Sequence, residues 1–177
     1  PDMEAFEAAV TPKTKAVIVN NPNNPSGVVY SEATIKKIAA IMDKKQKEYG
    51  TEIYLIADEP YRELVYDGVT VPFLTKYYDN TIVGYSFSKS LSLPGERIGY
   101  LVIPDEVVDA GMLQSAAGVA TRILGFVNAP TLMQRAVARC LDAEVNVEAY
   151  DRNRRALYDG LTKLGFECIK PQGAFYL

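Results

Sequence analysis

The sequence predicts an α/β fold built on a mostly parallel sheet. Short β-branched apolar runs alternate with longer stretches of helical periodicity, as expected for strands joined by crossover helices. The 177 residues, 48% hydrophobic and 23% charged, are enough for a buried core and close to average globular composition. Most of the predicted strands end in loops rich in polar side chains. We therefore expect a ligand crevice beyond the carboxyl ends of the strands.

The first predicted strand spans residues 16–19, an apolar run that ends where Asn20 and several turn-forming residues begin. A helix follows, for which Ser31 is the expected N-cap and Gly50 the expected end. Its apolar residues recur at helical spacing, at Ile35, Ile38, Ala39 and Met42. This strand and helix form the first predicted β–α unit.

Three more strands are predicted at residues 52–57, 81–85 and 98–103, and Pro104 ends the last of them. Helical periodicity covers residues 106–114, 131–141 and 147–164, and the last of these helices places Arg154 on its polar side and Leu157 and Leu164 on its apolar side. The apolar run at 173–177 predicts the start of another strand. Composition changes at residues 142–146, so we predict one domain at 1–145 and the start of a second at 146–177.

The net charge indicates which binding partners to expect, and the cysteines indicate the cellular compartment. A net charge of −3, from 19 basic and 22 acidic residues, gives no reason to expect nucleic acid or an anionic membrane as partner. No apolar stretch approaches the roughly 20 residues that span a bilayer. Cys140 and Cys168 form no CxxC pair, which favours a reduced, cytoplasmic protein.

The chain contains no histidine. This excludes Ser-His-Asp and Cys-His catalysis, HExxH zinc sites and histidine general bases within these residues, and we expect no metal site. Any chemistry must therefore depend on lysine, carboxylate, tyrosine or a cofactor.

Candidate functional residues lie at successive strand ends. Lys89, in the loop Ser88-Lys89-Ser90, is either a surface charge or a Schiff-base nucleophile, whose amine must be neutral to react. Asp58 is either a turn carboxylate or a fixed anion that faces a cation. Arg97 is either a surface residue or a bidentate phosphate ligand. Each residue alone has an ordinary structural explanation, but their occurrence together and in this order indicates a site.

This constellation resembles the class I/II aminotransferases, the aspartate aminotransferase-like group of fold-type I pyridoxal-phosphate enzymes. The resemblance rests on four motifs in the family's order and on one at the chain's end: Asn21-Pro22-Asn23-Asn24-Pro25-Ser26-Gly27, Asp58-Glu59-Pro60-Tyr61, Ser86-Phe87-Ser88-Lys89, Gly95-Glu96-Arg97-Ile98-Gly99-Tyr100 and Pro171-Gln172-Gly173-Ala174-Phe175-Tyr176. It implies the central part of a three-layer large domain with a mostly parallel sheet, plus the start of a small α+β domain. We accordingly expect a fragment of a longer enzyme.

The resemblance also implies roles for individual residues. Lys89 matches the catalytic lysine that forms a Schiff base with pyridoxal 5′-phosphate and later moves a proton at the substrate's Cα. Asp58 matches the carboxylate that pairs with the pyridine nitrogen, and Tyr61 and Asn24 match the groups that contact the ring oxygen O3′. The implied phosphate ligands are Ser86, Ser88 and Arg97.

The resemblance implies transfer of an amino group between an amino acid and a 2-oxo acid, by a full-length protein that is a homodimer. The fragment alone is expected to be inactive, because the family's glycine-rich phosphate turn, its stacking aromatic residue and its substrate-carboxylate arginine have no counterpart among these residues. Two alternatives stay open at this point. One is a carbon–sulfur lyase or related eliminating enzyme of the same fold, and the other is a non-catalytic, aminotransferase-like regulatory domain.

Overall fold

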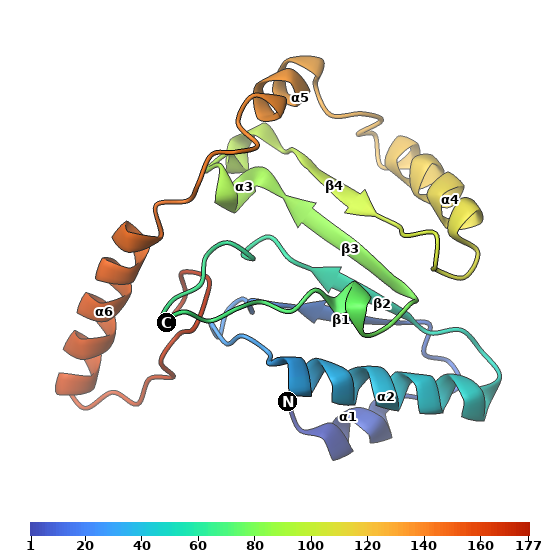
Figure 1. The fold of residues 1–177 in the computed structure, drawn as a ribbon, viewed down its shortest axis with the longest axis horizontal. Helices are drawn as coiled ribbons and strands as arrows, with labels where there is room; N and C mark the ends of the chain where they lie inside the picture. The colour runs from blue at the N-terminus through green and yellow to red at the C-terminus, as the bar shows by residue number, and fades with distance from the viewer.

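The computed structural model describes all residues from 1 to 177 and contains one four-stranded sheet in the order β1-β2-β3-β4. The strands are β1 (Ala16–Asn20), β2 (Tyr54–Asp58), β3 (Thr81–Ser86) and β4 (Gly99–Val102). The first three strands are parallel, whereas β4 runs antiparallel to β3 (Figure 1). The predicted α/β fold with a mostly parallel sheet is confirmed.

Six α-helices accompany the sheet: α1 (Met3–Ala9), α2 (Glu32–Tyr49), α3 (Phe87–Ser90), α4 (Ala110–Ile123), α5 (Thr131–Ala138) and α6 (Val147–Lys163). Short 3-10 turns lie at Leu74–Lys76 and Pro94–Glu96. In Figure 1, α1 and α2 lie side by side next to the sheet, and α4, α5 and α6 are spread around its other margins. None of the helices combines the length and the apolar character needed to cross a bilayer.

The main core lies between α2 and one face of the sheet. Ser31 caps α2 by accepting a hydrogen bond from the Thr34 amide at 3.2 Å, and Gly50 ends the helix in the left-handed conformation. The predicted apolar stripe of α2 is buried together with strand residues of alternating position, which are Val19, Leu55 and Ala57. Ile18, on the opposite face of β1, is 69% exposed. Residues 1–177 therefore cover β1 closely on one face only.

The reversal between β3 and β4 determines which groups meet at the carboxyl edge. The Phe87 amide donates to the Ile98 carbonyl at 3.1 Å, and Ser86 pairs with Gly99. A Cβ atom at Gly99 would clash with the Tyr85 carbonyl oxygen, so this close approach requires glycine. Because β4 is antiparallel, its first residues lie beside the carboxyl end of β3.

Two helices differ from the sequence prediction. Helix α1 was not predicted, and its N-cap Asp2 accepts a hydrogen bond from the Ala5 amide. Helix α4 occupies Ala110–Ile123, so the predicted helix at 106–114 is displaced toward the C-terminus. Burial of Val107 and a 2.8 Å hydrogen bond from the Val108 amide to Asn80 Oδ1 hold the preceding residues in turns.

The C-terminal region also corrects the prediction. Residues 173–177 form no strand, and their only ladder contact is an isolated bridge between Val65 and Gly173. Arg154, predicted on the polar side of its helix, is only 7% exposed, whereas Leu157 and Leu164 on the predicted apolar side are exposed. The reason is that partners from other segments surround the arginine, while no segment of residues 1–177 covers the two leucines.

Candidate active site

The carboxyl edge of the sheet brings three loops of the sequence together. The Asn21 amide donates to the Asp58 carbonyl at 3.2 Å, and the Glu59 amide donates to the Gly84 carbonyl at 2.9 Å. These bonds extend the parallel ladder beyond the strands themselves. The loops after β1, β2 and β3 therefore start side by side, as their shared position at the ends of parallel strands predicts.

Asn20 links two of the predicted site residues. Its Nδ2 donates to Asp58 Oδ2 at 2.9 Å, and its Oδ1 accepts from the Asn24 backbone amide at 2.6 Å. No role for Asn20 was predicted from the sequence. Its position as the last residue of β1, directly before the Asn-Pro motif, is the signal that could have found it.

Asp58 ends β2 as an anion without a cationic partner, because it takes part in no ion pair. Partial burial raises the pKa of its carboxyl group, and the hydrogen bond from Asn20 acts in the opposite direction. A positively charged group placed next to this carboxylate would therefore be stabilised.

Tyr61 is 4% exposed, and its hydroxyl lies 2.6 Å from the hydroxyl of Tyr176. Burial raises the pKa of the Tyr61 phenol, and the neighbouring Tyr176 raises it further, whereas the Asn24 side chain lowers it. The phenol is thus protonated at neutral pH and able to donate a hydrogen bond. No role was predicted for Tyr176, although it belongs to the motif at residues 171–176.

Lys89 belongs to the single-turn helix α3, directly after β3. Its ammonium nitrogen lies 4.9 Å from the ring centroid of Phe175 and 5.5 Å from that of Tyr61. Attraction between a cation and aromatic faces holds the amine at this place. The lysine forms no ion pair with a carboxylate.

The three predicted phosphate ligands lie at this same edge but are not joined to one another by their side chains. Ser86 caps α3, with its Oγ 3.4 Å from the Ser88 amide, and both serines are half-buried. Arg97 is exposed, and its guanidinium donates only to the Pro94 carbonyl at 2.8 Å. The pairing of Ser86 with Gly99 keeps the backbone of Arg97 close to Ser86.

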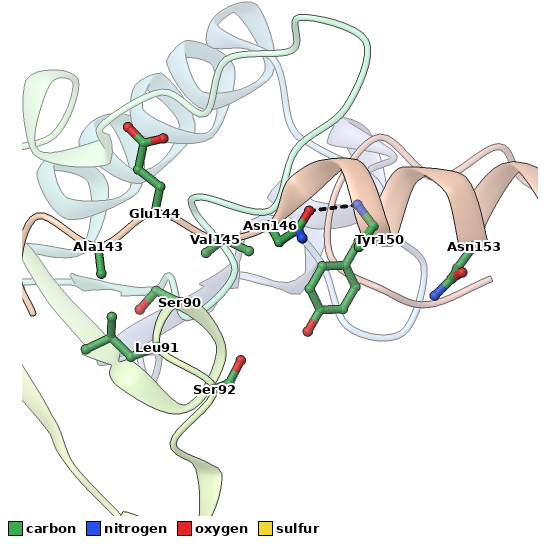
Figure 2. A pocket seen from close by; sticks show the side chains of 10 residues that line it. Ser90, Leu91, Ser92, Ala143, Glu144, Val145, Asn146, Tyr150 and Asn153 are labelled. Carbon is green, nitrogen blue, oxygen red and sulfur yellow. Dashed lines mark hydrogen bonds between the residues drawn. The ribbon is translucent and has the colours of Figure 1, made fainter.

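Two clefts adjoin the helical turn that carries Lys89. The first has a volume of about 590 Å³ and lies between the sheet and α4, lined by Asp58 and Ser86 together with Gly84, Gly99 and Thr121. The second, of about 570 Å³, is bordered by Ser90–Ser92 and by Tyr150 of α6 (Figure 2). The Tyr150 ring stacks on Phe175 with centroids 5.9 Å apart. Helix α3 thus has open space at both of its ends.

The arrangement offers an unpaired carboxylate, an amine and a guanidinium at one edge of a sheet. Asp58 suits a protonated ring nitrogen, the amine of Lys89 suits a carbonyl carbon, and Arg97 suits an anion such as a phosphate group. The cleft between the sheet and α4 has room for a ring-sized ligand within the range usual for small-molecule sites. These side chains contain no group of three or more potential metal ligands.

Comparison with known proteins shows which family the chain resembles. The family model described as "Aminotransferase class I and II" matches residues 1–177. A probable aspartate/prephenate aminotransferase of Thermus aquaticus is 34% identical over 179 residues, which cover 100% of this chain and 45% of that protein. A probable N-acetyl-LL-diaminopimelate aminotransferase of Bacillus subtilis is also 34% identical, over 97% of this chain and 42% of its own length. The chain therefore spans less than half the length of these relatives.

A solved structure shares the fold over nearly the whole chain. The crystal structure of an amino transferase from Eubacterium rectale superimposes with a TM-score of 0.94 at 57% sequence identity. The match covers 98% of this chain and 44% of the Eubacterium protein.

Proposed function

The chain belongs to the class I and II aminotransferase family, and we propose that it is part of an enzyme that moves an amino group between an amino acid and a 2-oxo acid with pyridoxal 5′-phosphate. The observation that carries the proposal is that Asp58 and Lys89 lie at the same edge of the sheet, each without an ion-pair partner. The carboxylate and the amine are thus both available to a ligand.

The residues present fit pyridoxal phosphate by their chemistry. When bound, this group supplies an aldehyde that condenses with amines and a ring that delocalises the electron pair left when a proton departs from Cα. Asp58 would hold the pyridine nitrogen, because a cation beside the carboxylate offsets the desolvation that raises its pKa. Ser86, Ser88 and Arg97 would bind the phosphate group through two hydroxyls and a guanidinium.

The remaining groups would act on protons. Lys89 would first hold the cofactor and then, once displaced by the substrate's amine, carry a proton to or from Cα. Tyr61, protonated at neutral pH, would donate a hydrogen bond to the ring oxygen, and the Asn24 amide would contact the same atom. Asn20 would keep the Asp58 carboxylate and the Asn24 backbone in register.

The proposal names a reaction class and no particular amino acid. The two curated relatives carry different substrates in their names, one aspartate and prephenate and the other N-acetyl-LL-diaminopimelate. We expect the whole enzyme to be a homodimer. Because both cysteines are unpaired, we also expect it to work in the reducing cytoplasm.

The test is amino transfer by the full-length protein that contains this chain. An amino acid and a 2-oxo acid are supplied together, and the new amino acid is measured by chromatography. Lys89→Ala should lower the rate by a factor of at least about 10² because the proton carrier is lost. The control Lys76→Ala removes another lysine that lies against an aromatic ring, 5.6 Å from the Phe73 centroid, and should leave the rate unchanged.

Two outcomes would contradict the proposed reaction. Repeated release of a 2-oxo acid and ammonia from the amino donor without any acceptor, beyond one equivalent per enzyme, would indicate an eliminating enzyme. Absence of both turnover and cofactor binding would indicate a non-catalytic, regulatory domain.

A further inference from the structure

Arg154 is a buried cation far along the chain from the strand-end motifs. Its side chain is 5% exposed, and its guanidinium lies 4.5 Å from the ring centroid of Tyr66. Each of its three nitrogens donates a hydrogen bond. Nε donates to Asp151, Nη1 to the Pro171 carbonyl at 2.8 Å, and Nη2 to the Asp67 carboxylate at 3.1 Å.

These partners belong to three different segments. Asp151 is on α6 with Arg154 itself, Asp67 lies in the loop after β2, and Pro171 begins the C-terminal segment 171–177. A single guanidinium therefore joins α6, the Asp67 loop and the C-terminal segment. Lysine could not replace it in kind, because its ammonium lacks the planar fork that reaches three separate acceptors.

The C-terminal segment runs between two loops of the sheet's carboxyl edge. The Gln172 amide donates to the Gly27 carbonyl at 2.7 Å, and the Ala174 amide donates to the Leu64 carbonyl at 2.8 Å. Arg154 lies over the ring of Tyr66, and the hydroxyl of this tyrosine donates to the Ala174 carbonyl at 2.5 Å. Burial raises the pKa of this phenol to about 12, so it stays a donor at any physiological pH.

The next two residues of this segment reach the candidate active site. The ring centroid of Phe175 lies 4.9 Å from the Lys89 ammonium nitrogen, and the Tyr176 hydroxyl lies 2.6 Å from the Tyr61 hydroxyl. Phe175 also packs edge-to-face on Tyr61, with centroids 5.5 Å apart. The position of the Lys89 amine therefore depends on where residues 171–176 are held.

We propose that Arg154 is a positioning residue, which fixes the C-terminal segment so that Phe175 and Tyr176 hold Lys89 and Tyr61 in place. The proposal deepens the proposed function and rests on it for the role of Lys89. Arg154 acts through the segment and contacts neither Lys89 nor Tyr61 itself.

Arg155 provides a matched control on the same helix. It pairs with the same two carboxylates, Asp151 at 2.7 Å and Asp67 at 3.7 Å, but its side chain is 63% exposed and it does not bond to Pro171. Exposed ion pairs of this kind contribute little to stability. A difference between variants of Arg154 and Arg155 thus isolates the buried clamp from charge alone.

The first arm of the test measures hydrogen exchange by mass spectrometry on Arg154→Gln, Arg154→Lys and Arg155→Gln. In both Arg154 variants, amides of residues 172–177 should exchange at least about tenfold faster than in the unaltered protein, because local opening becomes easier. Arg155→Gln should stay within about twofold of the unaltered protein. If residues 172–177 exchanged at the same rate in the Arg154 variants as in Arg155→Gln, the proposal would be overturned.

Peptides from α2 and β2 report whether the whole fold is intact in each variant. Should Arg154→Gln unfold, Asp67→Asn provides the second variant, since it removes the charge of one partner and leaves the guanidinium bonded to Asp151 and Pro171. Asp67→Asn should speed exchange at residues 172–177 alone. Unchanged exchange there in a folded Asp67→Asn protein would also overturn the proposal.

The second arm measures how fast pyridoxal phosphate labels Lys89. The amine and the aldehyde condense with loss of water, and borohydride adds hydride to fix the adduct for peptide mapping. The ratio of label on Lys89 to label on Lys76 should fall several-fold in Arg154→Gln and in Arg154→Lys, but not in Arg155→Gln. An unchanged ratio would contradict the positioning role. Absence of label on Lys89 in the unaltered protein would instead contradict the proposed function, while the exchange arm would still test the clamp.

Discussion

Gly173 lies where the C-terminal segment passes closest to the loop after β1. A Cβ atom built on Gly173 would lie 2.8 Å from Pro22 Cβ, 2.9 Å from Pro22 Cγ and 3.0 Å from the Leu64 carbonyl oxygen. Pro22 is fully buried and Leu64 is 0% exposed, so neither neighbour has free space to move into. Since carbon atoms prefer separations of about 3.5 Å or more, the segment would have to shift by roughly half an ångström.

We predict that Gly173→Ala lowers the free energy of unfolding by about 1–3 kcal/mol, the usual cost of an added methyl group in a tightly packed site. That loss corresponds to roughly a 5- to 150-fold smaller folding equilibrium constant. The displaced backbone carries Phe175 and Tyr176, so the contacts around Lys89 should weaken together with stability.

Gly160→Ala is the matched control. Gly160 lies inside α6, and a Cβ atom there would meet nothing within 4 Å. Alanine should therefore raise the free energy of unfolding by up to about 1 kcal/mol through its higher helix propensity.

Urea titrations followed by far-UV circular dichroism measure the free energy of unfolding of both variants. Tyrosine fluorescence is a second probe, because the chain has 12 tyrosines and no tryptophan. Gly173→Ala should have a lower midpoint than the unaltered protein at an unchanged slope, and Gly160→Ala a higher one. Equal midpoints for Gly173→Ala and the unaltered protein would refute the packing described for this segment.

Three further predictions test the core, the capping and the electrostatics. Ser31→Ala should lower the free energy of unfolding by about 1 kcal/mol in urea titrations, because the Thr34 amide loses its cap. Tyr78→Phe should lower it by about 1–3 kcal/mol, since the buried Ile53 carbonyl loses its 2.5 Å hydrogen bond; an effect no larger than that of an exposed Tyr→Phe change would contradict this. Burial raises the pKa of Asp58 in the folded protein, so the folded state binds this proton more tightly than the unfolded chain does. The unaltered protein should therefore lose stability relative to Asp58→Asn as the pH rises from about 3 to about 7, and parallel pH curves would contradict the shift.

Local sequence signals were sufficient for the sheet and for α2. The β-branched runs and the Ser31 cap are short-range features, and the strands differ from their predicted bounds by no more than two residues at either end. Helix α1 was missed because it is only seven residues long and depends on packing of Met3 and Phe6 against the main core. Its Asp2 cap was a readable signal.

Long-range contacts explain what the sequence could not show. Helical periodicity placed Arg154 among solvent-exposed arginines, because its partners Asp67 and Pro171 come from distant segments. Likewise, Asn80 holds the Val108 amide in a turn where periodicity predicted helix. The boundary at residue 145 and the individual roles of the site residues remain predictions.

The clustering of the candidate site residues at one edge was predictable from the sequence, but the geometry of their contacts was not. The order of motifs at successive strand ends was enough to bring Asn24, Asp58, Tyr61 and Lys89 to one edge. The aromatic faces around the Lys89 ammonium were not, since Phe175 reaches it only through the path of the C-terminal segment.

The proposed role of Lys89 is tested most simply by asking which lysine of this chain reacts with pyridoxal phosphate. The protein is incubated with a substoichiometric amount, reduced with borohydride and digested, and each lysine-containing peptide is quantified by mass spectrometry. We expect the Lys89 peptide to carry most of the label and Asp58→Asn to reduce this share. Label spread over the exposed lysines, with no excess on Lys89, would contradict the role proposed for Lys89.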